Sequence, residues 1–151
     1  MIDLKGKHAL ITGSSRGVGQ QIALALAKKG CHVIVHGRTK ESTQKTLELL
    51  KKFDITTYAV YGELSEELQV EELIKQVKSL AVPVDILYNN AAIMKTYRHD
   101  IWSHSYEDWI ETYKVNVIAM YKLCSAFIPD MIKNNFGRVV NTTSRIMNQP
   151  E

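Results

Sequence analysis

A glycine-rich segment near the N-terminus could bind a phosphate group. Residues 12–19 read Thr-Gly-Ser-Ser-Arg-Gly-Val-Gly, between an apolar run and a helical pattern. Gly13 would allow a sharp turn, Gly17 would let the backbone approach a pyrophosphate, and Gly19 would let the helix pack closely on the strand. The unpaired N–H groups at the start of that helix would attract the anion. This context predicts a nucleotide-binding turn rather than a glycine turn without a ligand. Its residues are Gly13, Ser14, Ser15, Arg16, Gly17, Val18 and Gly19.

Short apolar runs alternate with helical patterns along the whole chain, and this alternation predicts the fold. The expected strands are 8–11, 32–36, 56–61, 84–88 and 138–142, and the expected helices are 16–29, 41–53, 65–80, 106–112 and 115–133. Strands that alternate with helices predict parallel pairing with right-handed crossovers, and near-continuously apolar strands are typical of a sheet covered on both faces. We therefore expect an α/β fold, a doubly wound parallel sheet with strand order 3-2-1-4-5 and helices on both faces.

Several polar or glycine-containing segments follow directly after expected strands. They are residues 13–19, 37–38, 89–92 and 144. Ligands of doubly wound sheets bind beyond the carboxyl ends of the strands, at the point where the strand order reverses. We expect these segments to meet at one edge of the sheet.

Composition limits the partners and the compartment. The 151 residues carry a net charge of +3 without a block of lysine and arginine, which argues against nucleic acid as a partner. Cys31 and Cys124 are far apart and favour reduced thiols in a cytoplasmic protein. The start of the chain lacks the apolar core of a signal peptide, and the apolar run at 117–128 is too short to span a membrane. His99 and His104 lack a third ligand at helical spacing, so no metal site is expected.

Four motifs, in their order and spacing, resemble the classical short-chain dehydrogenase/reductase family. They are Thr-Gly-x-x-x-Gly-x-Gly at 12–19, Asn-Asn-Ala-Ala at 89–92, Lys-Val-Asn-Val at 114–117 and Gly-Arg-Val-Val-Asn-Thr-Thr-Ser at 137–144. The resemblance covers residues 5–148 and implies that residues 1–151 form one dinucleotide-binding Rossmann domain. The family's Tyr-x-x-x-Lys should follow Ser144, but no tyrosine in this sequence has a lysine four residues later. We therefore expect a truncated, N-terminal portion, incomplete at the C-terminal side of its sheet.

The resemblance also assigns roles to individual residues. Ser144 would polarise a substrate carbonyl, because hydride transfer to a carbonyl carbon leaves negative charge on the oxygen. Asn116 would kink a helix and hold a water molecule in the proton relay. The cofactor would contact Asn90, Ala91 and Ala92 beside the adenosine ribose, and Glu63 and Leu64 near the adenine. Ala92 replaces the family's glycine and Glu63 replaces its aspartate, so the geometry of both contacts is open.

Two arginines favour NADP(H) over NAD(H), although NAD(H) remains possible. Arg16 lies in the first turn of a helix, where a positive charge opposes the helix dipole unless an anion binds beside it. Arg38 follows the second strand, where NADP-binding members of the family often have a basic residue. The acidic residue that would bind a free ribose 2′-hydroxyl is missing, since His36 and Gly37 occupy that place.

The implied function is an NAD(P)(H)-dependent oxidoreductase that interconverts a carbonyl and a secondary alcohol. The substrate is a small molecule whose class stays open among 3-oxoacyl thioesters, sugars or polyols, and small ketones. The 151 residues alone are expected to be nearly inactive. One alternative is an inert NADP(H)-binding sensor or regulatory module, and another is a chain that only assembles with partners.

The helices within residues 106–133 are expected to form a homo-oligomer, because residues 115–128 are apolar on nearly all sides. Neither a membrane nor a nucleic acid is an expected partner. With no strand beyond it, the segment 138–142 should form an exposed apolar edge.

Overall fold

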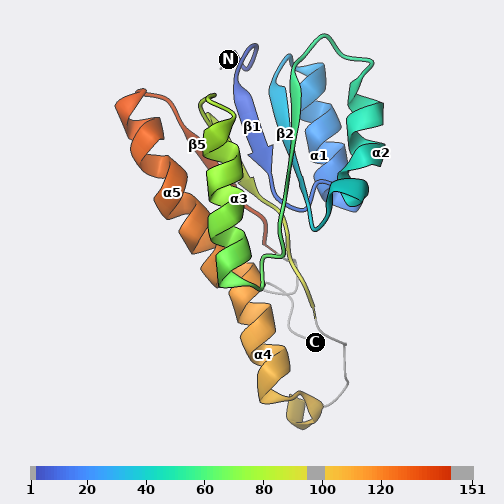
Figure 1. Cartoon of the computed structure of the whole chain (residues 1–151), viewed down its shortest axis with the longest axis vertical. Coiled ribbons are helices and arrows are strands. Elements are labelled where there is room, and N and C mark those ends of the chain that lie inside the picture. The colour runs from blue at the N-terminus through green and yellow to red at the C-terminus, as the bar shows by residue number, and fades with distance from the viewer. Residues whose placement is uncertain (1–2, 95–100, 144–151) are drawn as a thin grey trace.

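The sheet has the order expected from the sequence. The computed structural model describes residues 3–94 and 101–143. Its five parallel strands are β1 (His8–Ile11), β2 (His32–Gly37), β3 (Thr57–Tyr61), β4 (Ile86–Asn89) and β5 (Arg138–Asn141). They pair in the order β3-β2-β1-β4-β5, which confirms the predicted doubly wound topology (Figure 1). The strand order reverses between β1 and β4, and the cleft opens there.

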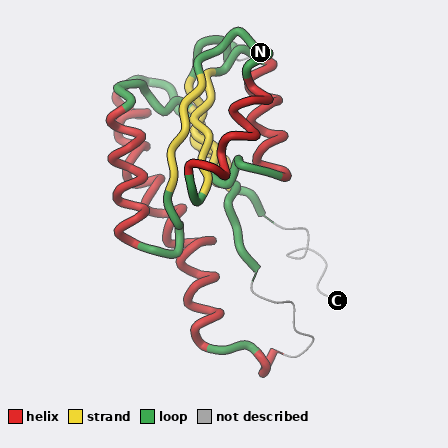
Figure 2. Tube along the Cα trace, turned by 45° about the vertical axis from the view of Figure 1, so that its right-hand side comes forward, coloured by secondary structure: helices red, strands yellow, loops and turns green. Residues whose placement is uncertain are grey.

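Helices cover both faces of the sheet (Figure 2). The described helices are α1 (Gly17–Lys28), α2 (Lys40–Leu50), α3 (Glu67–Ser79), α4 (Tyr106–Tyr113) and α5 (Ala119–Lys133). A short 3-10 turn, η1 (Ile101–Ser103), lies between β4 and α4, where the sequence predicts neither a helix nor a strand. Helix α2 begins at Lys40 because Thr39 and Ser42 form a capping box at its start.

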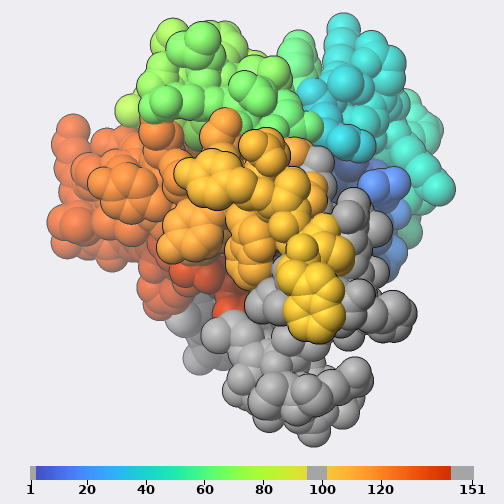
Figure 3. All heavy atoms as spheres, turned by 90° about the horizontal axis from the view of Figure 1, so that it is seen from below, coloured from blue at the N-terminus to red at the C-terminus, as the bar shows by residue number. Residues whose placement is uncertain are grey.

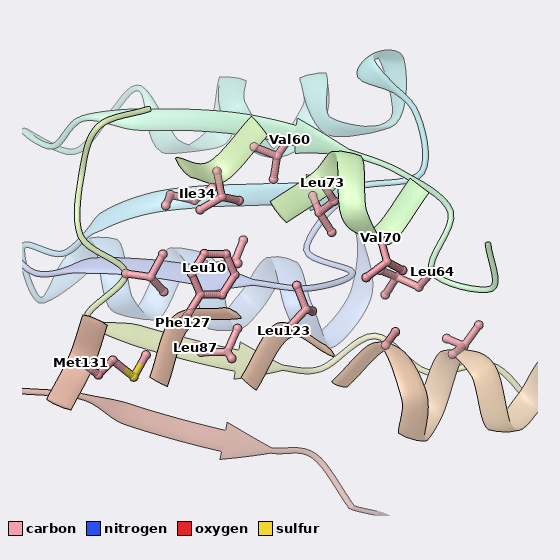
Figure 4. Packing of buried hydrophobic residues seen from close by; sticks show 14 residues of the cluster. Leu10, Ile34, Val60, Leu64, Val70, Leu73, Leu87, Leu123, Phe127 and Met131 are labelled. Atoms are coloured by element: carbon pink, nitrogen blue, oxygen red, sulfur yellow. The ribbon is translucent and has the colours of Figure 1, made fainter. Parts of the chain in front are cut away.

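Alternate residues of the strands point to opposite faces and build two separate cores. On one face, Leu10 and Ile34 pack against α3 and α5 through Leu73, Leu123 and Phe127 (Figure 4). On the other face, the neighbouring strand residues pack against α1 and α2; they are Ala9, Ile11, Val33, Val35 and Ile86, and the helices contribute Ala23, Ala27 and Leu50. Burial on both faces explains why the strands are apolar almost without interruption.

The expected break between the last two helices is wrong. A π-helical turn, η2 (Lys114–Ile118), joins α4 to α5, and the backbone stays helical on both sides of it. A π turn adds a residue to the helix without ending it. The resulting helix, Tyr106–Lys133, has 28 residues and is long and apolar enough to cross a membrane. A core helix of a soluble protein meets the same criterion, so the expectation that a membrane is not a partner stays a prediction.

Strand β5 lies at the edge of the described sheet, as expected. All four of its residues are exposed, including Val139 and Val140. An apolar edge strand with free backbone groups is a template for pairing with another strand.

Candidate functional site

A cleft of about 770 Å³ opens at the carboxyl ends of β1, β2 and β4. Every cofactor residue expected from the sequence lines it except Ser14. The expected residues that line it are Gly13, Ser15, Arg16, Gly17, Val18, Gly19, Arg38, Glu63, Leu64, Asn90, Ala91 and Ala92. Expected residues as far apart in the sequence as Gly13 and Ala92 thus share one cavity. His36, Ser42, Ile93, Glu111, Val115 and Thr142 complete its lining.

The turn requires glycine at its three positions for different geometric reasons. Gly13 has φ of +62° and Gly17 has φ of +58°, a backbone region that side chains disfavour. A Cβ on Gly19 would lie 2.4 Å from the carbonyl oxygen of Gly13 and 2.5 Å from Nδ2 of Asn90. Helix α1 can therefore approach the turn only where position 19 lacks a side chain.

The N-terminus of α1 carries neither a side-chain cap nor an acidic residue. Arg16 occupies the N-cap position with extended backbone, and no acidic residue lies in the first turn. The positive end of the helix dipole is therefore not offset by a carboxylate of its own first turn. This end of the helix suits an anion in the cleft.

Thr12 and Asn90 join the turn to the loop after β4. Oγ1 of Thr12 accepts hydrogen bonds from the backbone N–H groups of Asn90, at 3.0 Å, and Ala91, at 2.9 Å. Nδ2 of Asn90 donates to the Thr12 carbonyl oxygen at 3.0 Å. The Asn90 amide thus supports the shape of the turn as well as lining the cleft. Thr12 was recognised as part of the motif, but its supporting role was missed.

Ser14 is fully buried behind the turn and does not line the cleft. Its hydroxyl donates to the Ile11 carbonyl oxygen at 2.7 Å. Thr46 of α2 donates toward the carbonyl oxygens of Ser14 and Ser15 at 2.9 and 3.1 Å, and Nε2 of Gln20 donates to the Thr46 hydroxyl at 2.8 Å. These hydrogen bonds stabilise the turn on its buried side. The sequence signal for Gln20 is a polar residue on the otherwise apolar buried face of α1. Thr46 has no such signal, because the buried face of α2 also contains Thr43.

The two arginines flank the cleft and remain mostly free to reorient. Arg16 is exposed, and the Arg38 side chain is 72% exposed. An Nη atom of Arg38 lies 3.9 Å from a carboxylate oxygen of Glu63. An exposed ion pair at this distance stabilises a conformation by at most about 1 kcal/mol. Arg38 can therefore exchange this partner for an anion that binds in the cleft.

His36 lies at the base of the cleft with 2% of its surface exposed. Burial lowers the pKa of its imidazole to about 4, and its hydrogen bond to the Gly62 carbonyl opposes part of this shift. The ring is therefore neutral at pH 7. The sequence places His36 where an acidic residue would bind a free ribose, and it does not indicate these contacts.

Asn116 connects the π turn to the loop after β4. Its side-chain amide accepts a hydrogen bond from the backbone N–H of Ile93 and donates one to the carbonyl oxygen of Ile93, both at 2.9 Å. Asn116 lies within the π turn, at the place where the family resemblance implies a kink. Its role in proton transfer stays a prediction. Ser144 and His99 lie outside the described residues.

Comparison with known proteins identifies the family. The family model described as short chain dehydrogenase matches residues 7–151. The chain therefore belongs to the short-chain dehydrogenase/reductase family, of the classical type, as its motifs predicted.

Individual relatives cover nearly all of this chain, but the chain spans only about half of their length. The 3-oxoacyl-[acyl-carrier-protein] reductase FabG of Staphylococcus epidermidis is 31% identical over 139 residues, which cover 91% of this chain and 56% of the relative. The 5-keto-D-gluconate 5-reductase of Escherichia coli is 28% identical over 144 residues, which cover 95% of this chain and 56% of that protein.

Solved structures show the same arrangement. A 3-oxoacyl (acyl-carrier-protein) reductase from Agrobacterium tumefaciens with NADP bound has a TM-score of 0.90 at 33% identity, over 98% of this chain and 56% of that one. The L-sorbose reductase of Gluconobacter frateurii, in complex with NADPH and L-sorbose, also has a TM-score of 0.90, at 29% identity, over 99% of this chain and 57% of that one.

Proposed function

We propose that this chain binds NADP(H) in the cleft and forms the cofactor-binding part of an oxidoreductase. The reaction would interconvert a carbonyl and a secondary alcohol of a small-molecule substrate. The observation that carries the proposal is the glycine turn at the uncapped start of α1, with two arginines beside it and a neutral histidine below it.

The residues of the cleft fit a dinucleotide with a 2′-phosphate. Gly19 lets the start of α1 pack directly on the Gly13 carbonyl, which brings the first N–H groups of the helix to the cleft. The start of α1 would attract the pyrophosphate, and Arg16 and Arg38 would pair with the 2′-phosphate. Ala91 and Ala92 would lie beside the adenosine ribose, and the Glu63–Leu64 segment beside the adenine. A bound nicotinamide supplies or accepts the hydride.

Two related structures support this cofactor, because they contain NADP or NADPH. The relatives named above reduce 3-oxoacyl and sugar ketones according to their names, which supports a carbonyl substrate without choosing between these classes.

The catalytic residues are proposed only in part. Ser144 would polarise the substrate carbonyl, and Asn116 would hold the relay water from its π turn. The 151 residues contain no Tyr-x-x-x-Lys. A positioned general acid contributes about 10²–10⁴-fold to a rate. We therefore expect these 151 residues to bind the cofactor but to reduce ketones very slowly, so binding is the informative measurement.

Titration with dinucleotides tests the proposed function. We expect NADPH to bind more tightly than NADH by about 10²-fold, because two charge-assisted hydrogen bonds to the 2′-phosphate contribute about 1.5–3 kcal/mol each when well formed. Nucleotide fluorescence or calorimetry would measure both dissociation constants. Equal affinities, or tighter binding of NADH, would contradict the preference for NADP(H). Absence of binding by either would contradict the function.

We also propose that a second copy of the chain covers the exposed face of α4 and α5. The inner face of α5 packs on the core, whereas no residue of α4 is buried, and Trp109, Tyr113 and Tyr121 are 56%, 57% and 67% exposed. Figure 3, which views the molecule from below, shows the large side chains of α4 on the surface that faces the viewer. Exposed aromatic residues at helical spacing are typical of an interface. Exposed Glu107 and Lys114 on the same helix disfavour burial of this face in lipid.

Sedimentation measures this association. We expect a dimer at micromolar concentration, and we expect the double variant Trp109→Glu, Tyr113→Glu to be monomeric because it places two charges in the apolar interface. Leu68→Glu is the matched control, since Leu68 is 79% exposed on α3 and outside this face. A monomeric parent chain, or a dimeric double variant, would rule out this interface.

A further inference from the structure

Each ring nitrogen of His36 makes a hydrogen bond, and the two partners belong to different walls of the cleft. The backbone N–H of Gly13 donates to Nδ1 of His36 at 3.0 Å. Nε2 of His36 lies 3.1 Å from the carbonyl oxygen of Gly62. Gly13 belongs to the glycine turn, and Gly62 directly precedes Glu63 and Leu64 on the opposite side of the cleft.

These contacts require one tautomer of a neutral imidazole. Nδ1 accepts a hydrogen bond, so the ring proton is on Nε2 and is donated to the carbonyl oxygen. The low pKa of the buried ring, about 4, keeps it in this form at pH 7. A charged ring would have a proton on Nδ1 and could not accept from Gly13.

The backbone of His36 is joined to the same turn. The N–H of His36 donates to Oγ of Ser14 at 3.0 Å, and the N–H of Ser14 donates to the carbonyl oxygen of His36 at 2.9 Å. On the other side, the ladder between β2 and β3 ends with the pair Gly37 and Tyr61. The backbone N–H of Gly62 donates to the Gly37 carbonyl oxygen at 3.2 Å, and the His36 side chain adds a second bond, at the Gly62 carbonyl oxygen. Through its other ring nitrogen, the same side chain joins Gly62 to the glycine turn.

We propose that His36 is a positioning residue that holds the glycine turn and the Gly62–Leu64 segment at the separation a whole dinucleotide requires. This inference rests on the proposed function, which places the pyrophosphate at the turn and the adenine at Glu63 and Leu64. A ligand that contacts both walls depends on their separation. A fragment that contacts only the adenine wall does not.

The test compares NADPH with adenosine, which lacks both the pyrophosphate and the 2′-phosphate and therefore does not reach the glycine turn or its Arg16. His36→Phe removes both hydrogen bonds but keeps a planar ring. We expect NADPH to bind about tenfold more weakly, the factor that corresponds to one lost hydrogen bond, while the affinity for the fragment changes by less than about twofold. Fluorescence would measure the first affinity, and an NMR titration the second.

His32→Phe is the matched control. Nδ1 of His32 accepts from the N–H of Thr56 at 2.8 Å, so this variant loses the same kind of bond at the other end of β2. We expect this variant to bind NADPH and adenosine with the same affinities as the parent chain. If His36→Phe does not fold, His36→Asn and His36→Gln each replace the ring by an amide that can reach only one of the two partners, and the same difference between ligands is expected.

Unchanged NADPH affinity in a folded His36 variant would overturn the inference. An equal loss of affinity for both ligands would also overturn it, because a general structural role produces that result. In both cases the parent chain still binds NADPH and the proposed function stands. If the parent chain does not bind NADPH, the proposed function fails and the inference fails with it.

Discussion

Gly19→Val is expected to weaken dinucleotide binding by about 10²-fold, because the new side chain meets backbone that shapes the cleft. Even the first atom, Cβ, would lie 2.4 Å from the Gly13 carbonyl oxygen and 2.9 Å from the Gly13 carbonyl carbon. Backbone atoms cannot rotate away as the end of a side chain can, so the turn or helix α1 must shift. Overpacking of this kind also destabilises a fold by about 1–3 kcal/mol. Titration with NADPH, well below the unfolding temperature, measures the effect on binding.

Gly6→Ala provides the control for this substitution. Gly6 has φ of +75°, but a Cβ there would meet nothing within 4 Å. This variant should lose stability through backbone strain, by about 1–2 kcal/mol, and keep its affinity for NADPH. If both variants bind NADPH as the parent chain does, the close packing at Gly19 has no role in forming the site.

The double variant Arg16→Ala, Arg38→Ala is expected to lose about 10²-fold in affinity for NADPH and little in affinity for NADH. Both arginines border the cleft, and within the described part of the chain Arg38 has as its ion-pair partner only Glu63, at 3.9 Å and exposed. Their charge is therefore available to a 2′-phosphate, which NADH lacks. Parallel titrations with the two nucleotides measure the change in preference, and raised salt should reduce it because exposed charges are screened.

A control for net charge is Lys52→Ala, Arg138→Ala, which removes two exposed positive charges that do not line the cleft. This variant should keep the parent preference for NADPH. An equal loss of NADPH and NADH affinity in the variant at positions 16 and 38 would show that these arginines do not recognise the 2′-phosphate.

The local pattern of the sequence was sufficient to predict the architecture. Apolar runs such as 32–36, separated by helical patterns, led to the observed order of five parallel strands. The prediction worked because strands buried on both faces must be apolar throughout, and few topologies join them by short right-handed crossovers. The boundary between the last two helices could not be predicted, since the π turn at Lys114–Ile118 keeps the backbone helical where the pattern changes.

The sequence by itself determined most of the residues that line the cleft, because the glycine motif and the ends of the strands are local features. Only the tertiary structure decided what supports them. Thr46 meets Ser14 across 32 positions, and His36 meets Gly13 across 23 and Gly62 across 26. A polar side chain that becomes buried needs a hydrogen-bond partner, but the sequence does not identify that partner. The partner is set when β2 and α2 pack beside the glycine turn, since hydrogen bonds act only over about 3 Å.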